Sequence, residues 1–275
     1  MRAAFRAAAA EFRLRTLTAR RYPMMVLLEI LVPLMFTAMP LLLGRAVSGP
    51  RAAAHFAQNA GTPQYVPYLL IGSAVFIMVN RAFWDMGYWL RYEQQIGTLA
   101  AVSLTPTHNL VLAAGVGAYS AVRGALSGSL AYVVGCLAFG ANPFQPGLLI
   151  SLVFVAVGLL PLYGIGFLMV ALVLRVKESA KLLGVMQWGA SLVMGVFYPV
   201  FALPPILRAA AFLFPPTWVV NGARASMLGV GYFLGEWYLD LAILWLAVLL
   251  VPLLGIGVFE RTHRSLRANQ GLGAY

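Results

Sequence analysis

The stretch GLLISLVFVAVGLLPLYGIGFLMVALVL, residues 147–174, decides the fold class, because it contains no charged side chain over its whole length. A helix needs about 20 apolar residues to cross the hydrocarbon core of a bilayer. Other stretches of this kind lie at about 24–43, 65–90, 108–139, 182–203 and 237–259. The sequence therefore predicts an all-α, polytopic membrane protein with six transmembrane helices, built as a single transmembrane domain over residues 1–275.

The composition of the chain agrees with a membrane protein. Of its 275 residues 61% are apolar and 10% are charged, and the mean hydropathy is +0.85, whereas soluble domains are about 45–50% apolar and about 25% charged. The net charge of +11 would suggest nucleic acid in a soluble protein, but the basic residues gather at the ends of apolar spans. We therefore expect a lipid bilayer as partner, and no nucleic acid. The single Cys136 and three scattered histidines predict neither a disulfide nor a metal site.

The positions of arginine and lysine orient the predicted spans. Most of them lie before the first span, after the second, between the fourth and fifth, and after the sixth. Cytoplasmic loops carry an excess of these residues, so these segments are predicted to face the cytoplasm. Both termini, the segment 91–108 and the tail 260–275 are then cytoplasmic.

Residues 1–22 are predicted to form an amphipathic helix at the membrane interface. Arg6, Arg13 and Arg20 recur every seven residues beside Phe5 and Phe12. This is the spacing of a helix that lies on the membrane with its aromatic side chains facing down. A frayed basic tail is the alternative.

Two Pro-Pro pairs, Pro204–Pro205 and Pro215–Pro216, interrupt the segment 204–236 between the fifth and sixth spans. They cut an apolar stretch into pieces that are too short to cross the membrane. We expect two short helices, about 205–213 and 216–228, that dip back into the outer leaflet as a re-entrant hairpin. Backbone of this kind is tolerated at membrane depth only where protein or a water-filled cavity covers it.

Charged side chains within the predicted spans are costly and need partners. Arg81 and Asp85 lie four residues apart in the second span, so they share a helix face and can pair. Glu29 lies near the cytoplasmic end of the first span and Arg123 lies deeper in the third. These residues could bind substrate or relay protons. We favour structural ion pairs that hold the helices in register, because no chain of acidic residues crosses the bilayer.

The segment RYEQQIGTLAAVSLTPTH, residues 91–108, is polar but helix-forming, and it predicts a cytoplasmic helix over 92–106. Tyr92, Ile96 and Leu99 recur at helical spacing and predict a small apolar face, while the polar side chains between Tyr92 and Ile96 stay in water. A solvated loop without a partner is the alternative.

The order of these parts resembles the membrane subunit of an ABC-2 type transporter, the permease half of an ATP-driven exporter. A motif of the form E-x-x-x-G-T-L-x-x-x-x-x-T-P after the second span carries this resemblance. It stands here as Glu93, Gly97, Thr98, Leu99, Thr105 and Pro106. Ala100 departs from the family, in which an acidic residue often follows G-T-L. Pro-Pro-Thr at 215–217, with Arg224 after it, also fits the family's outer hairpin.

The resemblance implies a transport subunit that is not itself an enzyme. Its expected partners are a cytoplasmic ABC ATPase and a second permease, the same or related, and the cofactors ATP and Mg would be bound by the ATPase and not by this chain. The lack of a GxxxxGK[ST] phosphate loop agrees with this division. In the family the helix at about 92–104 is a coupling helix, seated in a groove of the ATPase with the N-terminal helix beside it. Its coupling residues here would be Tyr92, Glu93, Ile96, Gly97, Thr98, Leu99, Thr105 and Pro106. Gly97 would let another backbone approach, and Pro106 would end the helix.

The expected function is export of an amphipathic drug, lipid or natural product across the plasma membrane of a prokaryotic cell, with the first and fifth spans lining the interface between two permeases. Export of a polysaccharide or teichoic acid is the alternative within the family. A stand-alone secondary carrier is more distant, because it would favour inverted repeats. A membrane-embedded lipid-modifying enzyme, with Glu29, Arg81 and Asp85 as its site, is equally distant.

Overall fold

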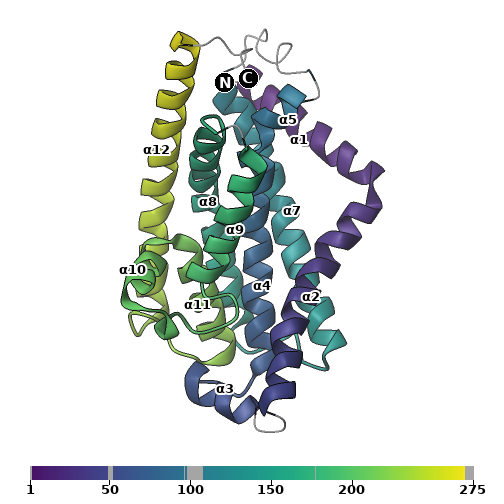
Figure 1. The fold of residues 1–275 in the computed structure, drawn as a ribbon, viewed down its shortest axis with the longest axis vertical. Coiled ribbons are helices and arrows are strands. Elements are labelled where there is room, and N and C mark those ends of the chain that lie inside the picture. Colours follow the sequence, from purple (N-terminus) through teal and green to yellow (C-terminus); the bar gives the residue numbers. More distant parts are fainter. Residues whose placement is uncertain (1, 49–51, 96, 98–107, 177, 270–275) are drawn as a thin grey trace.

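The computed structural model describes residues 2–48, 52–95, 97, 108–176 and 178–269, and among these residues it is helical without a strand. In chain order the longer helices are α1 (Arg2–Arg21), α2 (Pro23–Ser48), α3 (Ala52–Ala60), α4 (Tyr65–Arg81), α5 (Trp89–Gln95), α7 (Asn109–Ala138), α8 (Leu148–Val173), α9 (Ser179–Val193), α10 (Pro205–Leu213), α11 (Pro215–Leu228) and α12 (Trp237–Asn269). α4, α7, α8 and α12 run roughly along one common axis, whereas α1 runs obliquely to it (Figure 1). The predicted all-α class is confirmed for these residues.

Four helical stretches among the described residues are long and apolar enough to cross a membrane. They are Tyr65–Met86, Leu110–Ala138, Leu148–Val173 and Trp237–Thr262. They match the predicted second, third, fourth and sixth spans. The chain is therefore a helical protein suited to a membrane, as its composition indicated.

The predicted fifth span, 182–203, is wrong in its extent. The helix there, α9, has 15 residues and ends at Val193, so at about 1.5 Å per residue it reaches only about 22 Å, less than the hydrocarbon core of about 30 Å. Gly195 then takes a left-handed conformation with φ 65°, and a short 3₁₀ helix, η3 (Val200–Ala202), follows. The apolar run continues past a turn that hydropathy does not detect. α2 covers the predicted first span with 26 residues, and its crossing stays a prediction.

The two short helices predicted at about 205–213 and 216–228 are confirmed as α10 and α11. Each has proline in its first turn, where the missing N–H is not needed. α11 packs against α4, α8 and α12 and is buried over most of its length. Protein therefore covers this helix, whereas α10 exposes Ile206 and Leu213.

Glycines let the helices of the bundle come into backbone contact. A Cβ added to Gly255 of α12 would lie 2.2 Å from the carbonyl oxygen of Gly164 in α8, and one added to Gly128 of α7 would lie 2.7 Å from the carbonyl oxygen of Ala74 in α4. Small residues are the usual means of close packing between membrane helices. These contacts fix α4, α7, α8 and α12 as the frame on which the other elements rest.

The start of α1, helix α5 and the C-terminal end of α12 lie at one end of the bundle, the upper end in Figure 1. α3 lies at the opposite end, with α10 and α11 in the same half of the bundle. Helix α5 therefore shares its end of the molecule with the beginning and the end of the described chain.

Candidate functional site

A π-helical turn connects α4, the predicted second span, to the predicted coupling segment. α4 continues directly into the π-helix η2 (Ala82–Met86), and α5 begins at Trp89. Trp89 and Leu90 are buried beside Val170 of α8 and Phe259 of α12, and they anchor the start of α5 in the bundle. Single π-helical turns occur often at functional sites. The remaining side chains of α5 are polar and lie at the end of the bundle.

The predicted helix over 92–106 does not run through Gly97. α5 ends at Gln95, and Gly97 takes a left-handed φ of 77° while its N–H donates to the carbonyl of Gln94 at 3.2 Å. A left-handed glycine is a common helix stop. Gly97 therefore ends a helix, and no other described atom lies within 4 Å of a Cβ placed on it, so its predicted role in close backbone contact has no counterpart within the described chain.

Part of the predicted coupling face lies outside the described residues, so the face that would join Tyr92 to Ile96 and Leu99 stays a prediction. Tyr92 itself is 47% exposed on α5. The coupling residues outside the description are Ile96, Thr98, Leu99, Thr105 and Pro106.

Glu93 does not stay in water as predicted, because α1 lies beside it. The Glu93 side chain is only 12% exposed, and its carboxylate lies 3.8 Å from the Arg15 guanidinium. Arg15 also bonds Glu11 within α1 at 2.8 Å. An ion pair thus joins the N-terminal helix to α5 across a long separation in the sequence.

α1 rests on α7 through its small and aromatic residues. A Cβ on Gly115 would lie 2.5 Å from the carbonyl oxygen of Ala8, and the ring of Phe12 meets Tyr119 edge to face at 6.2 Å. Phe5 is 77% exposed. The prediction that Phe5 and Phe12 share a membrane-facing side is therefore wrong, because Phe12 packs within the protein.

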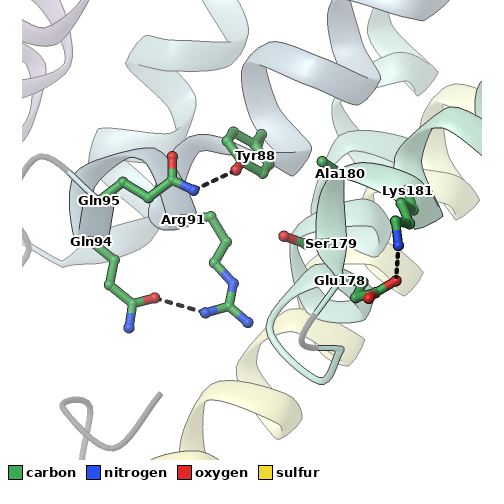
Figure 2. Close-up of a pocket in the computed structure, with 8 residues that line it drawn as sticks. All are labelled: Tyr88, Arg91, Gln94, Gln95, Glu178, Ser179, Ala180 and Lys181. Atoms are coloured by element: carbon green, nitrogen blue, oxygen red, sulfur yellow. Dashed lines mark hydrogen bonds and ion pairs between the residues drawn. The ribbon is translucent and has the colours of Figure 1, made fainter.

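A polar pocket of about 460 Å³ lies between α5 and the start of α9. Figure 2 shows its lining: Tyr88, Arg91, Gln94, Gln95, Glu178, Ser179, Ala180 and Lys181. Arg91 donates to the Gln94 side chain at 2.9 Å and to the carbonyl oxygen of Val176, just before α9, at 3.0 Å. On the α9 side, Lys181 pairs with Glu178 at 2.8 Å. The pocket is suited to receive polar side chains of a partner.

Further polar contacts join the helix ends around this pocket. Trp84 of η2 donates to Gln187 of α9 at 2.7 Å. Arg175, at the end of α8, donates to Thr262 of α12 at 2.8 Å. η2 is thus connected to α9, α5 to the connection that precedes α9, and the segment after α8 to α12.

The predicted pair of Arg81 and Asp85 forms. Their side chains are mostly buried and lie 3.3 Å apart where α4 passes into η2. Arg123 of α7 donates to the Tyr119 hydroxyl at 2.6 Å. Glu29 belongs to α2, but its side chain is outside the described part of the chain. Each of these two contacts lies within one continuous helical stretch, so the reading of these charges as ion pairs that hold helices in register stays a prediction.

Two buried charges, on α11 and at the start of α12, bind main-chain groups of neighbouring segments. Arg224 of α11 is 2% exposed and donates to the main-chain oxygens of Tyr68, Gly195 and Val196. Asp240 is fully buried and accepts the N–H groups of Phe233 and Leu234, both at 2.9 Å. The sequence placed Arg224 in the outer hairpin by resemblance to the family, but it gave no sign that this side chain is buried.

The described residues contain no cluster of three or more His, Cys, Asp or Glu that could hold a metal ion. A scan against protein-family models finds no match, and no curated protein matches the chain. The assignment of a function therefore rests on the motif and on the contacts around α5.

Proposed function

We propose that this chain is the permease subunit of an ABC-2 type exporter, which moves an amphipathic drug, lipid or natural product out of the cell with ATP hydrolysed by a separate ATPase. One observation carries the proposal. The motif that begins at Glu93 comes directly after α4 and η2, the predicted second span. The Arg15–Glu93 contact joins the N-terminal helix α1 to the start of this motif. This is the arrangement of coupling helix and N-terminal helix that the resemblance implies.

The contacts around α5 provide a route for coupling. The ATPase would dock at the exposed side of α5, near Tyr92, and at the polar pocket beside it. A shift of α5 would act on α9 through Arg91, which bonds the carbonyl of Val176, and on α4 through the π-helical turn. Alternating access would follow if α9 moves against the frame of α4, α7, α8 and α12.

The outward side of α9 supports a second permease as partner. Val185, Trp188 and Leu192 are exposed on this helix, and no described atom lies within 4 Å of a Cβ placed on Gly184 or Gly189. Small residues beside exposed apolar ones allow another helix to approach closely. In the proposed complex α2 and α9 of two permeases line the pathway, and both termini are in the cytoplasm. Each permease would have six membrane crossings, the fifth made by α9 together with the turn and the 3₁₀ helix η3 that follow it.

Co-purification from the native cells tests the proposal. A tagged chain should retain a soluble ABC ATPase, and Tyr92→Asp should lose it, because a charge then replaces an exposed aromatic side chain in the docking area. Tyr238→Asp is the matched control, since Tyr238 is similarly exposed (54% against 47% for Tyr92) but lies near the start of α12. The proposal is wrong if the purified chain transports its cargo without any ATPase.

A further inference from the structure

A second cavity, of about 220 Å³, lies deep between α7 and α8. Its floor comes from α4 and α11, with Ala74 and Met78 of the first and Ala223 and Met227 of the second. α7 and α8 form its walls, and Pro143 and Phe144 of their connection lie at one end. α4 packs against α7 and α11 packs against α8, so these two helices close the cavity from below.

The lining of this cavity is almost entirely apolar. The described residues around it carry no charge, and their polar side chains are Ser129, Tyr132 and Ser151. The Tyr132 hydroxyl already donates to the carbonyl oxygen of Pro143 at 3.3 Å. Apolar cavities stay dry and take apolar ligands, and this one has room for about seven waters at about 30 Å³ each. It is therefore large enough for a ligand and unsuited to water.

The cavity opens on the surface that faces the membrane. At its rim Phe144 is 71% exposed and Leu152 is 49% exposed. Both wall helices also carry exposed leucines, such as Leu130 of α7 and Leu149 of α8. Both wall helices are long and apolar enough to span a bilayer. The apolar molecule that meets this opening is therefore a membrane lipid.

We propose that the cavity between α7 and α8 binds an acyl chain of a membrane phospholipid. Transfer from lipid to protein gives no hydrophobic gain, so binding rests on the dispersion contacts that an empty cavity forgoes. The uncharged lining selects an apolar chain and leaves the headgroup unspecified. The bound chain would fill a gap between α4, α7, α8 and α11 and support their spacing.

Photocrosslinking tests this site. The full chain is reconstituted in phosphatidylcholine vesicles that contain a phospholipid with a diazirine in its acyl chain, and crosslinked residues are mapped by mass spectrometry. We expect labelling of Met78 and Met227, which are 5% and 6% exposed and lie on the floor of the cavity. Ala74→Leu, which adds three carbons inside the cavity, should abolish this labelling. Ala156→Leu, the same change on an exposed part of α8, should leave it intact.

The outcomes separate a bound chain from ordinary surface lipid. Labelling confined to exposed positions such as Leu130 and Leu152 overturns the proposal, as does floor labelling that persists when the cavity is filled. If Ala74→Leu does not fold, Val133→Trp on the α7 wall gives the second test, with loss of floor labelling again expected. The experiment measures no transport, so its result is independent of the proposed exporter function.

Discussion

Replacing Arg224 by methionine tests whether one buried cation holds the turn after α9 in place. Its guanidinium donates to the carbonyl oxygens of Tyr68 at 3.0 Å, Gly195 at 2.8 Å and Val196 at 2.5 Å. Methionine keeps a flexible apolar side chain but removes the charge and every donor. α4 and the turn after α9 then lose the side chain that binds both of them.

The size of the effect follows from the groups left behind. The Tyr68 carbonyl belongs to a helix and keeps its bond from the amide four residues on, but those of Gly195 and Val196 lie in a turn. Two buried acceptors without a donor cost about 2–6 kcal/mol, and loss of the cation 3.6 Å from the Tyr68 ring adds about 2 kcal/mol. Removing a desolvated charge offsets several kcal/mol. We expect a net loss of about 2–4 kcal/mol in the free energy of unfolding.

Thermal unfolding of the detergent-solubilised chain, together with hydrogen exchange over residues 194–200, measures this loss. Arg208→Met is the matched control, because Arg208 also donates to two main-chain carbonyls, those of Phe201 and Leu203, at a more exposed site. The control should change stability by less than about 0.5 kcal/mol. Wild-type unfolding and unchanged exchange in Arg224→Met would refute the anchoring role.

Two other predictions concern the helix contacts. Gly255→Leu should destabilise the chain by about 1–3 kcal/mol through overpacking, because a Cβ at this position would lie 2.2 Å from the Gly164 carbonyl oxygen. Gly257→Leu is the control, because no described atom lies within 4 Å of a Cβ placed there. It should leave thermal unfolding nearly unchanged. A double-mutant cycle of Arg15→Ala and Glu93→Ala should give a coupling free energy of about 0.2–1 kcal/mol, and zero coupling would contradict the join between α1 and α5.

The features predicted well from the sequence depend on local rules. The four membrane-length helices follow from the length of apolar runs, and α10 and α11 begin at the Pro-Pro pairs because proline suits the first turn of a helix and disrupts its interior. The pairing of Arg81 with Asp85 follows from a spacing of four residues within one helix. Each of these features needs no knowledge of a distant part of the chain.

The features that the sequence missed depend on distant partners. α9 ends early where Gly195 turns the chain, and the carbonyl oxygens of that turn are held by Arg224 of α11. Glu93 is shielded from water because α1, which is distant from it in the sequence, packs on α7 beside it. The sequence predicted a helix that runs to Pro106, whereas α5 ends at Gln95 and Gly97 takes a left-handed φ. Hydropathy and helical periodicity carry no information about these contacts or about the backbone conformation of a glycine.

The kinds of contact divide the bundle into a frame and a set of attached elements. α4 meets α7, and α8 meets α12, through glycines at backbone distance, and packed interfaces of this type resist gradual deformation. Polar side chains join α5 to α1 through Arg15 and to the connection before α9 through Arg91, and Trp84 joins η2 to α9. Polar contacts of this kind can exchange partners with less repacking than the buried glycine contacts. A force applied at α5 would therefore reach α1 and α9 before it distorted the frame, which is the property that a coupling segment requires.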